Sequence, residues 1–369
     1  MIKLAVKNLL QEKARLVTAV GGVAAAIVLI LFLDGVFVGS SEQTVAYIER
    51  SGAGVWVMQK GASNMHMAAS ALPEVVTDRL RAAPGVKSAT PILYAGTLLS
   101  AGGKESFSYV VGLRQDAQRG APWAMKAGDP IPGQGEAVLP EILTRKAGLT
   151  IGDEVTILNR PFTVVGLSEG TFTLANTVTF ISYDDLAAIM AAPGVASYIL
   201  VEPEKGTDPS ALARTLMESF PEVNALTSSQ LADNDRAMIR QMGANIIQVM
   251  SFIGSIVGVL VIGLTTYTAT VRRAREYGVV KALGATNAGL LTVIVLQTLV
   301  LAMLSLIVAV AVMYALIPLL GIVAPEVPIA LSPGSLAMRV GTTLVIAVVA
   351  AVLPAIRMSR VEPAVVFKG

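Results

Sequence analysis

Cysteine is absent from the 369 residues, and histidine occurs only once, as His66. The missing thiols exclude disulfides, zinc–thiolate sites and thiol nucleophiles on this chain. A single histidine excludes a metal site built from several histidines. Charged residues make up only 15% of the chain, and the net charge of +2 is too small to indicate a nucleic-acid partner.

Catalytic motifs are missing as well. The sequence has no G-x-x-x-x-G-K-[ST] loop, which excludes nucleotide binding in the P-loop manner. No H-E-x-x-H, G-x-S-x-G or S-x-x-K motif occurs in a suitable strand-to-helix context. We therefore predict that the chain is not an enzyme.

Apolar residues are abundant, at 54%, and the mean hydropathy is +0.66. A span across about 30 Å of hydrocarbon needs about 20 mostly apolar residues. The first run is too long for a signal-peptide core and is followed by no A-x-A-like site, which favours a retained helix. Four runs qualify as spans: residues 16–38, a part of 241–271, a part of 282–325 that ends in a turn at "IPLLGIVAPEVP", and 336–356.

Lysine and arginine gather at one set of span ends. The positive-inside rule therefore places both termini and the 272–286 stretch in the cytoplasm, with residues 40–239 outside it. The residues that carry this bias are Lys3, Lys7, Lys13, Arg15, Arg272, Arg273, Arg275, Lys281, Arg357, Arg360 and Lys368.

The outer region shows short strand-like runs such as "GVWVMQ", "FSYVVGL", "DEVTIL", "FTVVGL" and "NTVTFIS", separated by Gly, Pro and Asp turns. Two stretches, each side of a β-rich insertion at about 113–192, repeat the order strand, helix, P-x-V turn, strand, although common α/β patterns also produce such a likeness. A helix capped at Ser228 or Ser229 then leads into the second span. The predicted fold is an α-helical membrane protein with four spans and one mixed α/β extracytoplasmic domain. Its predicted parts are 1–39 (N-terminal helix and first span), 40–240 (outer domain) and 241–369 (three spans).

The stretch "RRAREYGVVKALGAT", residues 272–286, lies between two spans yet is typical of a helix. Glu276 lies close to Arg272 and Arg273 on a helical surface, and Gly284 follows as a stop. Val279, Val280 and Leu283 form an apolar ridge.

This stretch resembles the cytoplasmic signature of the FtsX/MacB-like family of ABC transporter permeases. The N-terminal "IKLAVKNLLQEKARLVTAVGGVAAAI", the terminal "LPAIRMSRVEPAVVFKG" and the insertion "GEAVLPEILTRKAGLTIGDEVTILNRPFTVVGL" resemble the same family. The likeness covers essentially the whole chain in order, with one span, an outer domain and three further spans.

The resemblance implies a homodimer bound to two separate ATP-binding subunits, which would hold ATP and Mg, with no cofactor on this chain. It implies that 272–286 is a coupling helix docked on the ATPase, whereas an amphipathic helix lying on the anionic inner leaflet is the alternative. The candidate coupling residues are Arg272, Arg273, Glu276, Tyr277, Val280, Lys281, Leu283 and Gly284.

Other residues have two interpretations each. Asp34 is either a functional group at membrane depth or the mark of a helix that emerges into water. The G-x-x-x-G pairs Gly35/Gly39 and Gly254/Gly258 are candidates for dimer packing, although small residues are common in membrane helices. Met65, His66 and Met67 are substrate candidates able to ligate a soft metal or haem iron, or an ordinary packed loop.

The predicted function is export or extraction of a hydrophobic or amphipathic compound, such as haem, a lipid, a drug or a peptide, from the bacterial cytoplasmic membrane. The alternative is a mechanotransmitting module that regulates an extracytoplasmic partner, such as a cell-wall hydrolase, and transports nothing. Under these interpretations the chain also contacts membrane lipids and an extracytoplasmic adaptor or hydrolase.

Overall fold

The computed structural model describes residues 13–173, 176–324 and 326–359. The predicted cytoplasmic ends, residues 1–12 and 360–369, lie outside these ranges. The described chain divides into two compact units. Of the described residues, a membrane unit comprises 13–39, 243–324 and 329–359, and an outer unit comprises 40–173, 176–242 and 326–328.

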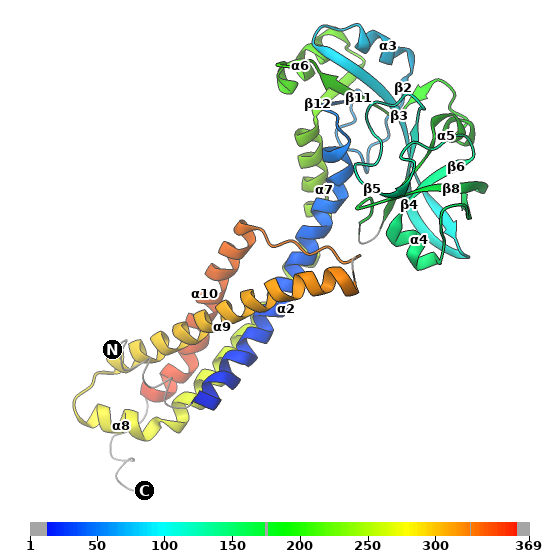
Figure 1. Cartoon of the computed structure of the whole chain (residues 1–369). Coiled ribbons are helices and arrows are strands. Elements are labelled where there is room, and N and C mark those ends of the chain that lie inside the picture. The colour runs from blue at the N-terminus through cyan, green and yellow to red at the C-terminus, as the bar shows by residue number, and fades with distance from the viewer. Residues whose placement is uncertain (1–12, 174–175, 325, 360–369) are drawn as a thin grey trace. The chain divides into compact units, whose positions relative to one another are not determined.

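The membrane unit is built from long apolar helices (Figure 1). By length and composition, the described residues contain four candidate spans, which confirms the predicted fold class. The spans belong to α2 (Lys13–Arg50), α7 (Ser228–Arg272), α9 (Asn287–Val323) and α10 (Pro333–Ser359), and the short α8 (Ala274–Ala282) separates the second span from the third.

Two helices run further than their apolar runs indicate. Helix α2 continues past Val38 to Arg50, so the chain stays helical as it leaves the membrane unit. Helix α9 passes through Pro318 and ends at Val323, so the predicted turn begins several residues later than "IPLLGIVAPEVP" implied. A proline in a helix removes one backbone hydrogen bond, but packing of the surrounding turns can retain the helix.

The outer unit contains the two predicted strand–helix–strand segments. Their strands form adjacent antiparallel pairs in the order β12-β1-β11-β3, the arrangement of a split β-α-β fold. The first segment is β1 (Val55–Gln59), α3 (Val75–Arg81) and β3 (Val86–Ala101); the second is β11 (Tyr198–Pro203), α6 (Pro209–Ser219) and β12 (Val223–Thr227).

The β-rich part continues the same sheet. Strand β3 pairs with β11 along its first half and with β4 along its second, so this part begins before the predicted residue 113. The order beyond β3 is β4-β9-β6-β8-β5, and β7 pairs with β3 and β8. The remaining elements are β2 (Leu72–Pro73), β4 (Lys104–Leu113), β5 (Met125–Gly128), β6 (Glu136–Pro140), α4 (Glu141–Ala147), β7 (Glu154–Ile157), β8 (Arg160–Ser168), β9 (Thr177–Ser182), α5 (Tyr183–Ile189) and β10 (Val195–Ala196).

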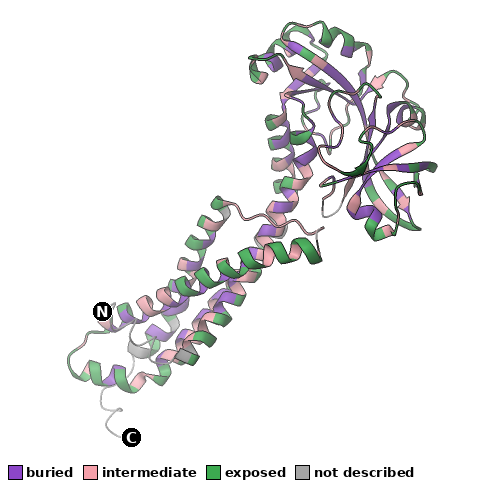
Figure 2. Cartoon of the chain, in the orientation of Figure 1, coloured by how far each residue is buried: buried purple, intermediate pink, exposed green. Residues whose placement is uncertain are grey.

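Burial differs between the units. Strand residues of the outer unit that face the core are buried, and the helices of the membrane unit carry many exposed residues (Figure 2). Trp56 is fully buried between Tyr47 and Tyr198, with ring centroids 6.0 and 5.7 Å away. Trp123 is only partly buried and lies beneath the Arg50 guanidinium. The apolar exposure of the helices is what a lipid-facing surface requires.

Candidate functional site

Helix α8 begins and ends at defined backbone signals. Helix α7 ends at Arg272, and Arg273 is the residue that precedes α8. At the other end Gly284 adopts a φ of +98°, which a residue with a Cβ rarely adopts. The N–H of Gly284 donates to the Lys281 carbonyl at 3.0 Å, and that of Ala285 donates to the Val280 carbonyl at 3.1 Å. The helix therefore covers residues 274–282, within the predicted 272–286, and a glycine-based stop turns the chain toward α9.

One face of α8 is anchored in the membrane unit. Tyr277 is buried, and its hydroxyl donates to the Gln297 Oε1 at 3.1 Å. Burial raises the pKa of Tyr277. Tyr277 therefore differs from the other candidate coupling residues, because it holds α8 in place rather than facing a partner. Its buried apolar neighbours in this cluster are Leu290, Val293, Ile294, Ala351 and Ala355.

The opposite face of α8 carries a stripe of exposed residues, which we call the α8 stripe: Glu276, Val279, Val280 and Leu283. Spacings of three and four residues place them on one side of the helix. Leu283 is 84% exposed, the highest value among the large exposed apolar residues. Among the other predicted residues, Arg272 is exposed, whereas Arg273 and Lys281 are half-buried. An apolar ridge beside charged groups at the end of a bundle is typical of a surface that another protein covers.

The structure does not place Asp34 at the point where its helix emerges into water, which was one of its two interpretations. The Arg339 guanidinium of α10 donates to the Asp34 carboxylate at 2.9 Å, and each side chain is only 10% exposed. The helix continues well beyond Asp34. Arg339 lies inside α10.

The four glycines predicted at a dimer interface are buried or packed within the chain. A Cβ at Gly35 would lie 2.8 Å from the Ile329 side chain, and one at Gly254 would lie 2.7 Å from that of Ile30. A Cβ at Gly258 would contact Ile346 at 3.5 Å, and Gly39 is buried. These distances assign the first three positions to packing between the chain's own segments.

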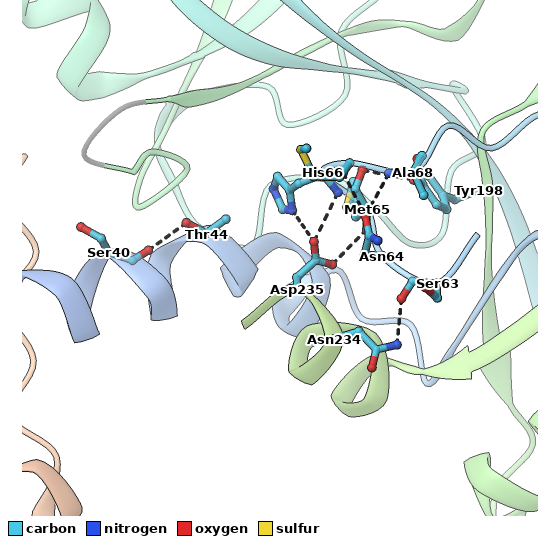
Figure 3. A network of polar contacts seen from close by, with 11 residues as sticks. Ser40, Thr44, Ser63, Asn64, Met65, His66, Ala68, Tyr198, Asn234 and Asp235 are labelled. Atoms are coloured by element: carbon cyan, nitrogen blue, oxygen red, sulfur yellow. Dashed lines mark hydrogen bonds and ion pairs between the residues drawn. The ribbon is translucent and has the colours of Figure 1, made fainter. Parts of the chain in front are cut away.

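The residues 65–67 do not converge on one ligand site. Met65 is 2% exposed and Met67 is 67% exposed, so their sulfur atoms lie in different surroundings. The His66 Nδ1 lies 2.9 Å from the Asp235 Oδ1, and Asp235 is fully buried (Figure 3). In the part of the chain that the structure describes, no group of three or more His, Asp or Glu side chains is placed to hold a metal ion.

Asp235 is the residue of this network that sequence reasoning missed. Its carboxylate also accepts from the backbone N–H groups of Met65 and His66, at 3.0 and 3.3 Å. The Asn234 side-chain amide donates to the Ser63 carbonyl at 2.8 Å (Figure 3). The first turns of α7 therefore hold the 63–68 loop of the outer unit. Burial raises the pKa of Tyr198, and the Asp235 carboxylate raises it further.

A second missed cluster joins α2 and α7. The Arg236 guanidinium donates to Glu42 at 2.7 Å and to Glu49 at 2.6 Å. The sequence signal in this region is the i, i+3 spacing of Asp233 and Arg236, which pair at 3.0 Å and do not indicate Glu42 or Glu49. The contacts of Arg236 with Glu42 and Glu49 tie together the two helices that continue into the membrane unit.

Comparison with known proteins decides the family. Residues 16–218 match the MacB-like periplasmic core domain, and residues 248–363 match the FtsX-like permease C-terminal domain. The chain belongs to the FtsX/MacB-like family of permeases. This permease is 24% identical over 372 residues to an uncharacterized ABC transporter permease of Mycobacterium tuberculosis, with 100% of both chains covered. It is 23% identical over 377 residues to another from Mycobacterium bovis, again with 100% coverage of both.

Two solved outer domains are also similar to this permease. The periplasmic region of MacB from Actinobacillus actinomycetemcomitans is 16% identical, with a TM-score of 0.38, covering 51% of this chain and 94% of that one. The extracellular domain of the noncanonic ABC-type transporter YknZ from Gram-positive bacteria is 11% identical, with a TM-score of 0.36, covering 47% and 98%. The family matches and the full-length relatives, rather than these structural scores, show that the permease is a multi-pass membrane protein of the ABC transporter class, which implies an ATP-binding subunit as its partner.

Proposed function

We propose that this permease works as a homodimer with two ATP-binding subunits and exports or extracts a hydrophobic or amphipathic compound. The α8 stripe is the observation that carries the proposal. An exposed apolar ridge on a short helix, anchored by Tyr277 and ended by Gly284, is suited to docking in a cleft of the ATPase. The ATPase holds ATP and Mg and performs the hydrolysis, and this chain contributes no catalytic residue.

The homodimer part of the proposal is supported by the exposure of α7. Only 11% of the apolar stretch with which α7 would cross the membrane is buried within the chain, against 28%, 33% and 29% for the corresponding stretches of α2, α9 and α10. Phe252, Leu260 and Leu264 are among its exposed side chains. Lipid can cover such a face, but a second copy would bury it as well, and the family assignment favours a dimer. In this proposal the permease lies in the bacterial cytoplasmic membrane. Both of its termini and α8 lie on the cytoplasmic side.

The continuity of α7 favours mechanical transmission as the means of action. Its 45 residues, from Ser228 to Arg272, run unbroken between the Asp235 network of the outer unit and the start of α8. A stiff helix passes displacement along its axis, whereas a flexible linker absorbs it. The same feature supports the second candidate function, regulation of an extracytoplasmic hydrolase without transport. Haem, lipids, drugs and peptides remain the substrate classes of the first.

Substitutions in the α8 stripe test the docking role. Leu283→Asp places a carboxylate in the docking cleft. A buried charge without a partner costs on the order of several kcal/mol of binding free energy. Glu276→Lys reverses a charge, worth about 1 kcal/mol or less at a rim and about 2–5 kcal/mol when desolvated. We expect Leu283→Asp to abolish co-purification with the ATPase and Glu276→Lys to weaken it.

The matched control is Ile151→Asp, the same kind of change at an exposed apolar residue of the outer unit. It should leave co-purification unchanged, and all variants should insert at parental levels. A helix that lies on the membrane surface predicts instead that Leu283→Asp leaves the complex intact. Parental recovery of the ATPase with both stripe variants would refute docking through α8.

A further inference from the structure

Among the described residues of the membrane unit, the span ranges contain one ion pair, Asp34–Arg339, which lies near the ends of residues 16–38 and 336–356. Between residues 16–38, 252–271, 287–323 and 336–356, the only Asp, Glu, Lys or Arg residues are Asp34 and Arg339. They lie 305 positions apart in the sequence, on α2 and α10, and meet at 2.9 Å. Charged residues inside spans are rare and usually pair with one another, because each is costly in hydrocarbon without a partner.

The backbone beside this pair is joined as well. The Ala330 N–H donates to the Gly35 carbonyl at 3.0 Å, and the side chains of Ile329 and Leu331 occupy the space that a Cβ at Gly35 would need. The segment that leads into α10 is therefore packed against α2 at the residue next to Asp34. We call the Asp34–Arg339 ion pair together with this Gly35–Ala330 hydrogen bond the α2–α10 clasp.

A small apolar groove, with room for about one water molecule, lies one helical turn from the clasp. Ile30 of α2 precedes Asp34 by four residues, and Thr343 of α10 follows Arg339 by four, so each lies one turn from the pair. The groove lies between α2, α7 and α10, and it is lined by Val23, Ala26, Ile27, Ile30, Gly258, Val261, Ile262, Thr343 and Ile346.

The physical chemistry of the clasp differs from that of its surroundings. Apolar contacts between helices bring little net stabilisation in lipid, because lipid tails are as apolar as leucine. The ion pair and the hydrogen bond therefore supply the directional contacts at this point. Separating the charges in a dry site is costly, so they part only when water reaches both of them. The clasp is therefore expected to have two discrete states. In the closed state the two charges are paired, and in the open state both are hydrated.

We propose that Asp34 and Arg339 are positioning residues of the transport cycle, and that the α2–α10 clasp opens in each cycle to admit water to the groove lined by Thr343 and Ile346. The inference rests on the proposed ATP-driven function, but the clasp residues are not part of α8, so the labelling test in the leucine background can fail or succeed independently of docking through α8.

The first test compares labelling rates of single cysteines in this cysteine-free chain, with the permease and its ATPase reconstituted in lipid nanodiscs. Thr343→Cys reports on the groove, and Val345→Cys, on the exposed side of the same helix, is the matched control. The probe is a charged, membrane-impermeant thiol reagent. In the Asp34→Leu/Arg339→Leu background we expect the Thr343→Cys site to react about tenfold faster, the ratio for a change of about 1.4 kcal/mol, with the control rate unchanged.

The double leucine change is chosen because replacing both members of a buried ion pair by apolar residues is usually tolerated, whereas removing one leaves an unpaired charge. Exchange of the charges, in Asp34→Arg/Arg339→Asp, should restore slow labelling. An unchanged rate at Thr343→Cys in the leucine background would overturn the proposal. Faster labelling at both cysteines would show general loosening of the bundle and would also count against it.

The second test asks whether the clasp moves or only braces the spans. With Asp34 and Arg339 intact, the Thr343→Cys rate is measured in nucleotide-free, ATP-bound and ADP-bound complexes. We expect the rate to differ at least about threefold between two of these states. A rate that is the same in all three states would show that the clasp is a static brace and would refute its opening.

Discussion

At the scale of single residues, two buried polar groups organise segments that are distant in sequence. Asp235 is fully buried, and its carboxylate accepts hydrogen bonds from two backbone N–H groups and faces the only histidine of the chain. Tyr277 has the same role in the membrane unit, where it anchors α8 through Gln297. In both cases a polar side chain is buried only because its partners are already in place, since an unsatisfied group costs free energy.

Removal of the Asp235 carboxylate should destabilise the outer unit. Asp235→Ala leaves the buried Met65 N–H, the partly buried His66 N–H and the His66 ring without this partner, and we expect a loss of about 2–4 kcal/mol in the free energy of unfolding. Thermal denaturation of the purified permease, followed by the fluorescence of its two tryptophans, Trp56 and Trp123, both in the outer unit, measures this loss. Asp233→Ala is the control, because Asp233 is 70% exposed and its ion pair with Arg236 is worth about 1 kcal/mol or less. Equal melting of the two variants would contradict the role assigned to Asp235.

At the scale of elements, the start of α7 is a capping box that begins one residue before the predicted cap. The Gln230 N–H donates to the Thr227 hydroxyl at 3.2 Å, and the Thr227 N–H donates to the Gln230 side chain at 3.0 Å. Thr227 is therefore the cap rather than Ser228 or Ser229, because the reciprocal bond needs glutamine three residues after the cap. The helix that follows extends from this cap to Arg272, and its partner α8 depends on packing instead of on a side-chain cap.

The anchoring of α8 can be tested separately from its docking face. Tyr277→Ala removes a buried aromatic ring, a change that typically costs about 3–5 kcal/mol, whereas Tyr277→Phe removes only one hydrogen bond, worth about 1 kcal/mol. We expect the alanine variant to loosen α8, so that limited trypsin digestion cleaves after Arg275 and Lys281 much faster than in the parent. The phenylalanine variant should digest nearly as slowly as the parent. Equal digestion of all three chains would show that Tyr277 does not anchor the helix.

At the scale of the whole molecule, the chain alternates between two environments. Its spans expose apolar residues, and its outer unit buries them in a sheet of mixed strands flanked by short helices. The lysines and arginines beside the spans predict which ends lie in the cytoplasm, because basic residues near spans are retained on that side. No side-chain contact in the structure bears on this orientation, so it stays a prediction.

Single cysteines test the orientation in intact cells. We expect an impermeant thiol reagent to label a cysteine at Ser63, in the outer unit, and to leave cysteines at Ala285 and Lys368 unlabelled until the membrane is permeabilised. The reason is that positions 285 and 368 lie beside the basic clusters. Labelling of the Ala285 site but not of the Ser63 site would reverse the predicted topology.

Local patterns in the sequence determined the parts of this permease that depend on neighbours along the chain. Apolar runs predicted the spans, alternating residues and turn signals predicted β1, β4, β7, β8 and β9, and the repeated strand–helix–strand order predicted both halves of the split fold. The charged stretch and Gly284 similarly indicated a helix with a defined end between two spans. These features follow from backbone propensity and from the solvent that each segment meets.

Only the tertiary structure decided how residues far apart in the sequence are paired. Asp34 meets Arg339 across 305 positions, and His66 meets Asp235 across 169. It also decided that Tyr277 faces inward while Leu283 faces outward, and that Gly35 and Gly254 serve contacts within the chain. The physical reason is that a charge or a missing side chain shows that a partner is needed without showing which one. The partner is determined by packing, which brings one among many equally suitable residues into contact.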